Sequence, residues 1–193
     1  MNNDFTEGYE EIESPKVDNN KSMKFFTEWI LPILLALVIA GLINKFLVFK
    51  VLIPSGSMLP THKVGDQLFV TKIYNTDKIE RGDIIVFYSK ELGDLLIKRV
   101  IGLPGDEISI DDTGSVLVNG GKIEEAYVKH PDRDPKAHSG KFNVPKDKFL
   151  FLGDNRDNSK DSRFWEEPYI DKSEIKGKAQ VRVYPFDRVG MVR

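Results

Sequence analysis

The fold class is decided by residues 83–101, whose sequence is DIIVFYSKELGDLLIKRVI. This stretch holds two runs of β-branched and aromatic residues, 83–88 and 94–101, and such runs are typical of strands. Similar runs lie at 66–74, 148–152 and 178–184. No apolar stripe at helical spacing competes with them, so the chain beyond Ile53 is predicted to be mostly β.

Two local patterns divide this β region. Residues 116–123 contain the pair Asn119-Gly120, which supplies the positive φ angles that a tight hairpin turn needs. Residues 130–141 are rich in Pro, Asp and Lys and are predicted to form an exposed loop.

A long apolar run, residues 29–53, precedes the β region. About 20 helical residues cross the ~30 Å hydrocarbon layer, so residues 25–49 are predicted to form a transmembrane anchor. The alternatives are the apolar part of a cleaved signal peptide, for which Val-Ile-Ala at 38–40 offers a small-residue pattern, and a buried helix of a soluble protein. A long acidic segment before the run, and a hydrophobic pattern that resumes after Lys45, favour a retained anchor.

Composition indicates one membrane-anchored domain. The 193 residues carry a net charge of −2, which argues against a general nucleic-acid binder. Residues 1–24 hold six acidic residues and three lysines and few aliphatic residues, and are predicted to form a disordered tail. Lysines on the two sides of the apolar run nearly balance, so their bias leaves the orientation open. Without cysteine, the chain has no disulfide, thiol nucleophile or zinc–thiolate site.

Residues 54–61, PSGSMLPT, place Ser55 and Ser57 around a glycine directly after the apolar run. A serine hydroxyl is a weak nucleophile until a base takes its proton, so the chemistry depends on which base is available. His62 is predicted to lie at the surface, and a role as the base is kept as an alternative. A serine–lysine pair is the other known solution. The remaining histidines are His130 and His138 of the polar loop.

Lys98 lies inside an apolar strand pattern, whereas most other lysines fall in polar segments. A catalytic lysine must be neutral near pH 7, which requires its pKa of ~10.4 to fall by about three units through burial or like charges. The two-residue period of a strand puts Lys98 on one face with Leu96 and Val100. Arg99 cannot be the base, because a guanidinium stays charged. The alternative is that Lys98 protects an edge strand and points to water.

A third polar segment, GDNRDNSKDSR, spans residues 153–163. Its aspartates suggest a calcium loop, but counting from Asp154 or from Asp157 puts the wrong residues at the ligand positions, so no metal site is predicted. The aspartates and arginines can instead pair with one another and hold a hydroxyl such as that of Ser159 in place. A solvated turn is the alternative.

Taken together, four segments resemble the type I signal peptidases, the membrane-bound serine–lysine endopeptidases that remove signal peptides from exported precursors. The segments are PSGSMLPT (54–61), RGDIIVF (81–87), KRVIGLPGD (98–106) and GDNRDNSKDSR (153–163). The resemblance implies a catalytic core of coiled antiparallel β-sheets, made by residues 50–106 and 144–193, with a small β insertion at 107–143.

The resemblance also implies a role for each site residue. Ser57 would be the nucleophile and Lys98 the general base, which returns the proton to the leaving amine. The Ser55 hydroxyl would join the Ser57 N–H in an oxyanion hole, and Ser159 would orient the lysine amine. The supporting contacts would be Asp161 with Arg163 and Asp154 with Arg99. No cofactor is expected.

Secretory precursors with signal peptides are the implied substrates, and membrane phospholipid is an implied contact. The chain would pass once through the cytoplasmic membrane, with its N-terminal tail inside and its catalytic domain outside. Two pairs of apolar residues are either core residues or contacts to the outer leaflet. They are Met58 with Leu59 and Phe164 with Trp165.

Two other functions compete with this one. A catalytically inactive, membrane-anchored β domain that binds export partners would most simply lack Ser57 or Lys98, and both are present. A self-cleaving serine–lysine repressor would need a DNA-binding helical domain in place of the anchor, and would cut itself at an Ala-Gly bond. Ala40-Gly41 is such a bond, but it falls inside the predicted anchor.

Overall fold

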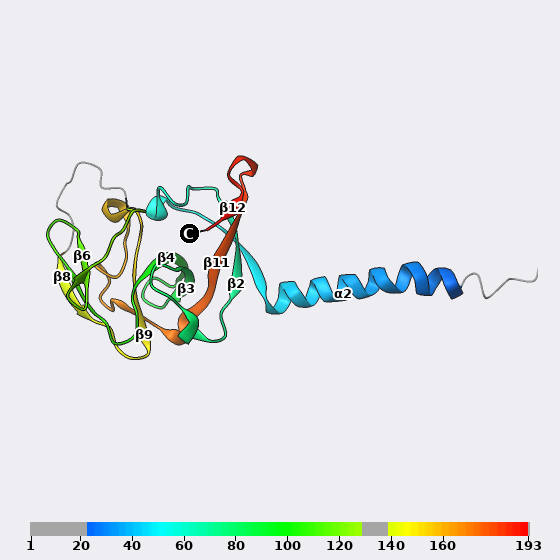
Figure 1. Cartoon of the computed structure of the whole chain (residues 1–193), viewed down its shortest axis with the longest axis horizontal. Helices are drawn as coiled ribbons and strands as arrows, with labels where there is room; N and C mark the ends of the chain where they lie inside the picture. The colour runs from blue at the N-terminus through cyan, green and yellow to red at the C-terminus, as the bar shows by residue number, and fades with distance from the viewer. Residues whose placement is uncertain (1–22, 129–138, 193) are drawn as a thin grey trace, which may run out of the picture. The chain divides into compact units, whose positions relative to one another are not determined.

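The computed structural model describes residues 23–128 and 139–192. Most of the predicted tail, His130, His138 and most of the predicted loop at 130–141 lie outside the described residues. The chain divides into two compact units, one up to Leu42 and one from Ile43 onward (Figure 1).

The first unit is helical. A π-helical turn, Phe26–Ile30, leads into helix α2, Leu31–Phe46, and the whole helix runs over the 24 residues Met23–Phe46. None of its residues is buried. At 1.5 Å per residue it is about 36 Å long, so it is long and apolar enough to cross a membrane.

The predicted anchor extended to residue 49, whereas the helix ends at Phe46. Strand β1, Val48–Leu52, begins almost at once and pairs with β2, Gln67–Lys72, so that Phe49 lies opposite Val70. An apolar run that resumes after a polar residue does not by itself distinguish another helical turn from the start of a strand.

Eight of the described strands form one sheet in which each neighbouring pair is antiparallel, with the order β1-β2-β11-β3-β4-β9-β10 and with β12 added to β11. The further strands are β3 (Ile84–Ser89), β4 (Asp94–Gly102), β9 (Lys148–Leu152), β10 (Tyr169–Asp171), β11 (Ile175–Tyr184) and β12 (Gly190–Met191). Figure 1 shows β2 beside β11, although they are far apart in the sequence. The prediction of a mostly antiparallel β fold after one apolar helix is confirmed.

Strand β4 lies in the interior of this sheet, between β3 and β9. Lys98 stands opposite Ile85 of β3, and Arg99 stands opposite Leu152 of β9. At Lys98, β4 pairs with β3, whereas its pairing with β9 begins at Arg99, but the Lys98 side chain is only 4 % exposed. The alternative that Lys98 points to water is therefore wrong.

A second sheet has the strand order β7-β6-β5-β8. Its strands are β5 (Glu107–Ile110), β6 (Val116–Val118), β7 (Gly121–Lys122) and β8 (Gly140–Asn143), and all of them fall within residues 107–143. Asn119 and Gly120, with φ angles of 50° and 80°, form the turn between β6 and β7, as the Asn-Gly pair predicts.

Three clusters of buried apolar side chains hold the sheets together. The first surrounds Phe87 and Phe151, whose rings stack with their centroids 4.2 Å apart, and it includes Trp165. The second joins the two sheets, since Leu150 of β9 and Ile108 of β5 both belong to it. The third consists of Ile53, Met58, Leu68, Ile84 and Ala179.

Two of the apolar residues considered for membrane contact are core residues. Met58 is fully buried in the third cluster, and Trp165 is buried in the first. The exposed aromatic side chains of the second unit lie elsewhere, with Phe186 the most exposed at 82 %.

Gly177 of β11 lies close against the backbone of β2. A Cβ atom at this position would lie 2.4 Å from the Thr71 carbonyl oxygen and 2.7 Å from Cγ1 of Val70. Gly177→Ala should therefore separate the two strands and lower the free energy of unfolding by about 1–3 kcal/mol. Urea unfolding followed by tryptophan fluorescence measures the change.

The matched control is Gly190→Ala in β12, where a Cβ atom would meet nothing within 4 Å. This variant should change the free energy of unfolding by less than about 0.5 kcal/mol. Equal unfolding midpoints for the two variants would contradict the close approach of β2 and β11.

Candidate active site

Ser57 sits in a 3-10 turn, Gly56–Met58, which follows the extended residue Ser55. The Met58 side chain is buried in the third cluster, and the Met58 carbonyl accepts a hydrogen bond from the N–H of His62 at 2.8 Å. Ser57 itself is only 7 % exposed. Its hydroxyl therefore has a fixed position with little access to solvent.

Lys98 reaches Ser57 from the middle of β4. Its Nζ atom lies 2.5 Å from Ser57 Oγ, and the side chain is 4 % exposed. Burial lowers the pKa of the Lys98 amine from 10.5 to about 8, although the carboxylates of Asp161 and Asp154 act in the opposite direction. About a tenth of such an amine is neutral at pH 7, and in that form it can accept the Ser57 proton.

A groove of about 430 Å³ opens beside these two side chains. It is lined by residues 51–55 and Ser57, by residues 94–98 and by Val86. Ser55 is exposed in this groove, and its hydroxyl donates a hydrogen bond of 3.3 Å to Ser57 Oγ. Because the two lining segments contain strand backbone and mainly aliphatic side chains, the groove suits an extended apolar segment of peptide.

The segment 153–163 holds the Ser57 turn by its backbone. Asn155 donates its backbone N–H to the Ser57 carbonyl at 3.1 Å and its Nδ2 to the Gly56 carbonyl at 3.0 Å. A Cβ atom on Gly153 would lie 2.2 Å from Ser159 Oγ and 2.5 Å from the Ser57 carbonyl oxygen. Position 153 therefore requires glycine.

Ser159 is buried against Gly153, and its hydroxyl has no hydrogen-bond partner among the described residues. The predicted hydrogen bond between Ser159 and Lys98 is therefore not formed among the described residues. The role of Ser159 in orienting the lysine amine stays a prediction, supported by a free hydroxyl that lies close to Ser57.

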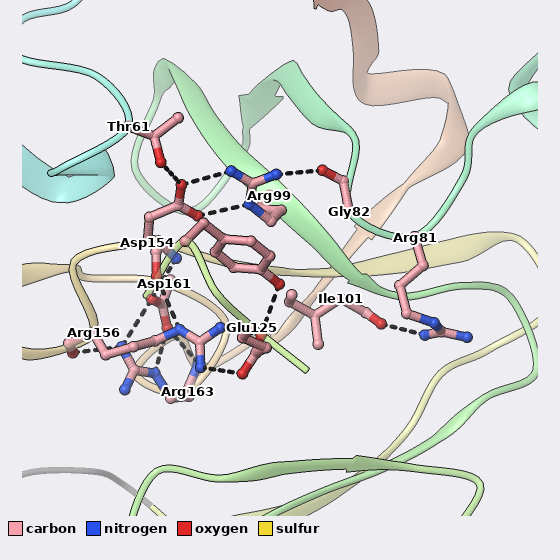
Figure 2. Close-up of polar contacts among 12 residues, drawn as sticks. Thr61, Arg81, Gly82, Arg99, Ile101, Glu125, Asp154, Arg156, Asp161 and Arg163 are labelled. Atoms are coloured by element: carbon pink, nitrogen blue, oxygen red, sulfur yellow. Dashed lines mark hydrogen bonds and ion pairs between the residues drawn. The ribbon is translucent and has the colours of Figure 1, made fainter. Parts of the chain in front are cut away.

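Arg99 and Asp154 form a buried, bidentate ion pair (Figure 2). Nε and Nη2 of Arg99 donate to Oδ1 and Oδ2 of Asp154 at 2.8 and 2.7 Å, and Nη1 donates to the Gly82 carbonyl at 2.6 Å. The Thr61 hydroxyl donates to Oδ2 of the same carboxylate at 2.5 Å. This pair therefore joins strand β4 to residues 54–61, which include Ser57, and to residues 153–163.

Asp161 and Arg163 form a second buried pair, also visible in Figure 2. Nε and Nη2 of Arg163 donate to the two oxygens of Asp161 at 2.8 and 2.9 Å. Asp161 Oδ2 also accepts the Gly153 N–H at 3.0 Å, and Arg163 Nη2 donates to the Arg156 carbonyl at 2.8 Å. The second pair thus fixes the shape of the loop that carries Ser159.

Sequence reasoning missed several residues of this site. Thr61 and Asn155 lie inside quoted segments, but no local pattern ranked them above their neighbours. Glu125 and Tyr127 carried no signal at all, because only the folded chain brings them to Arg156 and Arg99.

His62 was predicted to lie at the surface, and this prediction is wrong. Its side chain is 1 % exposed, and its Nδ1 lies 3.9 Å from Asp66 Oδ2. Burial, assisted by the Arg182 charge, lowers the pKa of His62 to about 4, so the imidazole is neutral at neutral pH. The hydrogen bond to Ser57 Oγ comes from Lys98 instead.

Comparisons with known proteins give a consistent result. The model of the family described as signal peptidase, peptidase S26, matches residues 26–184. Signal peptidase I of Leptolyngbya laminosa is 43 % identical over 185 residues, covering 91 % of this chain and 88 % of the relative. Signal peptidase IB of Staphylococcus aureus is 38 % identical over 179 residues, covering 84 % and 92 %.

Among solved structures, a signal peptidase I from Enterococcus faecalis is 28 % identical, with a TM-score of 0.47, and covers 52 % of this chain and 96 % of that one. The family match spans most of the chain, including Ser57 and Lys98, and the two relatives align over most of their own length. The chain therefore belongs to the signal peptidase family, peptidase S26.

Proposed function

We propose that Ser57 and Lys98 form the dyad with which this protein removes N-terminal signal peptides from exported precursors. The observation that carries the assignment is the buried Nζ of Lys98 at 2.5 Å from Ser57 Oγ. The protein is a serine endopeptidase by its family, and a serine–lysine dyad is the mechanism of that family.

The neutral amine of Lys98 accepts the proton of Ser57 as Oγ attacks the carbonyl carbon of the scissile peptide bond. The Ser57 N–H and the Ser55 hydroxyl donate to the oxyanion, and donors of this kind are each worth ~2.7–4 kcal/mol. Lys98 then gives its proton to the leaving amine, which departs and leaves an ester on Ser57. A water molecule, deprotonated by Lys98, hydrolyses this ester and restores the enzyme.

The substrate would enter the groove between residues 51–55 and 94–98 as an extended strand. Backbone hydrogen bonds would then supply affinity, and the aliphatic walls would admit small apolar side chains before the cut. Ser159 would hold the Lys98 amine in line with Ser57, and the two ion pairs would fix the backbone around it.

Helix Met23–Phe46 would anchor the protein in the cytoplasmic membrane by a single pass, with the catalytic unit on the outer side, where exported precursors emerge. An exposed apolar cluster near the end of the chain would contact phospholipid, since aromatic side chains favour the membrane interface. The cluster consists of Tyr184, Phe186, Val189 and Met191.

The two competing functions are not favoured. An inactive binding domain gives no reason to bury a lysine amine against a serine hydroxyl, since this burial destabilises the fold. A self-cleaving repressor would have to cut Ala40-Gly41, but this bond lies within helix α2, where the backbone is not extended.

Ser57→Ala, Lys98→Ala and Lys98→Arg should each reduce cleavage of a purified secretory precursor by more than about 10³-fold, because each removes the nucleophile or the base. Far-ultraviolet circular dichroism should show all three variants folded. The control is Lys122→Ala, an exposed lysine of β7, which should retain full activity. Wild-type activity in Ser57→Ala or in either Lys98 variant would contradict the assignment.

The pH dependence of kcat/KM gives the pKa of the general base. Because the pKa of Lys98 is lowered to about 8, kcat/KM should fall about tenfold per pH unit below that value and level off above it. The measurement is kcat/KM on a signal-peptide substrate between pH 5 and pH 10. No acid limb near pH 8, with activity constant down to a limb between about pH 4 and pH 6.5, would indicate a histidine base instead.

Lys98→Met should stabilise the fold while abolishing activity. The folded-state pKa of Lys98 is lowered from 10.5 to about 8, so the folded protein binds fewer protons between these values and stability rises with pH across that window. Below pH 8 the full cost of burial is present, and the variant should gain about 1–3 kcal/mol in free energy of unfolding. Urea unfolding at pH 7 and pH 10.5 tests this, because the gain should shrink at the higher pH.

A further inference from the structure

Arg99 is the residue next to the proposed base, and one face of its guanidinium is covered by an aromatic ring. Cζ of Arg99 lies 3.8 Å from the centroid of the Tyr127 ring, well within the range of cation–π stacking. Tyr127 belongs to the segment that follows β7, inside the insertion of residues 107–143. The insertion therefore reaches the catalytic core at the position beside Lys98.

In its plane, each of the three nitrogens of the Arg99 guanidinium donates one hydrogen bond, two of them to Asp154 and one to the Gly82 carbonyl. Stacking on the Tyr127 ring adds a constraint perpendicular to that plane and helps to keep the guanidinium 2 % exposed. Without the ring, water would reach the guanidinium and weaken its bond to Asp154.

Tyr127 is itself held in place by Glu125. The Tyr127 hydroxyl donates to Oε1 of Glu125 at 2.8 Å. Nη1 and Nη2 of Arg156 donate to the same carboxylate at 3.0 and 2.5 Å, and Figure 2 shows Glu125 beside Arg156. Nε of Arg156 donates to the Gly153 carbonyl at 3.0 Å. The insertion is therefore linked to two consecutive residues of the core. Glu125 binds Arg156, which donates to Gly153, and Tyr127 stacks on Arg99, which donates to Asp154.

From this geometry we propose that Tyr127 is a positioning residue of the active site, which holds Arg99 against Asp154 and so limits the negative charge that Asp154 exerts on Lys98. The inference rests on the proposed function of Ser57 and Lys98. It gives the insertion a role in the reaction, although none of its described residues lines the groove.

The consequence is electrostatic. The carboxylates that act on the Lys98 amine are Asp161 and Asp154, and both raise its pKa against the effect of burial. Each is paired with an arginine, Arg163 or Arg99. If Arg99 loosens, the charge of Asp154 is less compensated, the pKa of Lys98 rises, and less of the amine is neutral at pH 7.

The test compares Tyr127→Leu, which loses the ring, with Tyr127→Phe, which keeps it, in the full-length protein in detergent. In Tyr127→Leu the acid limb of kcat/KM should move up by at least about 0.5 pH unit, giving about threefold lower kcat/KM at pH 7 and recovery above pH 9. KM should not change. Tyr127→Phe should restore the wild-type limb, and Tyr88→Leu, an exposed tyrosine of β3, should keep it as well.

A uniform loss of activity at every pH in Tyr127→Leu, or an unshifted limb, would overturn the proposal. If Tyr127→Leu does not fold, Tyr127→Met replaces it, because methionine fills more of the volume of the tyrosine side chain. The same shift of the acid limb of kcat/KM is expected for it. Wild-type cleavage by Ser57→Ala in the same assay would instead overturn the proposed function, so the two failures can be told apart.

Discussion

The structure depends on keeping the amine of Lys98 away from water and against Ser57 Oγ. A lysine in an apolar strand is unfavourable in its charged form, and burial accordingly moves its pKa from 10.5 to about 8. Strand β4 can hold this residue because β3 pairs with it at Ile85 and apolar clusters pack around the sheet. The nucleophile is fixed by the same core, since buried Met58 follows Ser57 directly.

Two carboxylates near Lys98 oppose the effect of burial on its pKa. Asp154 and Asp161 shape the loop around Ser57, yet their charge favours the protonated lysine, which cannot act as a base. Each carboxylate is paired with an arginine, Arg99 or Arg163, through two hydrogen bonds, and the positive charge of the arginine offsets part of the carboxylate charge. The two aspartates can therefore hold the loop around Ser57 while the pKa of Lys98 stays low. The Tyr127 ring, which stacks on Arg99, connects the insertion to these ion pairs.

Much of the fold could be predicted, because β-branched runs and the Asn119-Gly120 turn are local signals. Ser57 and Lys98 could also be found, since an apolar strand around a lysine is visible in the sequence. The end of the helix at Phe46, the burial of His62 and the stacking of Tyr127 on Arg99 could not. Each of these depends on which distant segments meet after folding, and no local pattern records that.

The most direct measurement of the central claim is the pKa of the Lys98 amine itself. Nuclear magnetic resonance of the protein with ¹³C-labelled lysine, compared with Lys98→Arg for assignment, would follow the titration of this one side chain. The account predicts a resonance that titrates near pH 8 and is absent from the variant. A Lys98 resonance that titrates near 10.5, like that of a solvated lysine, would contradict the account.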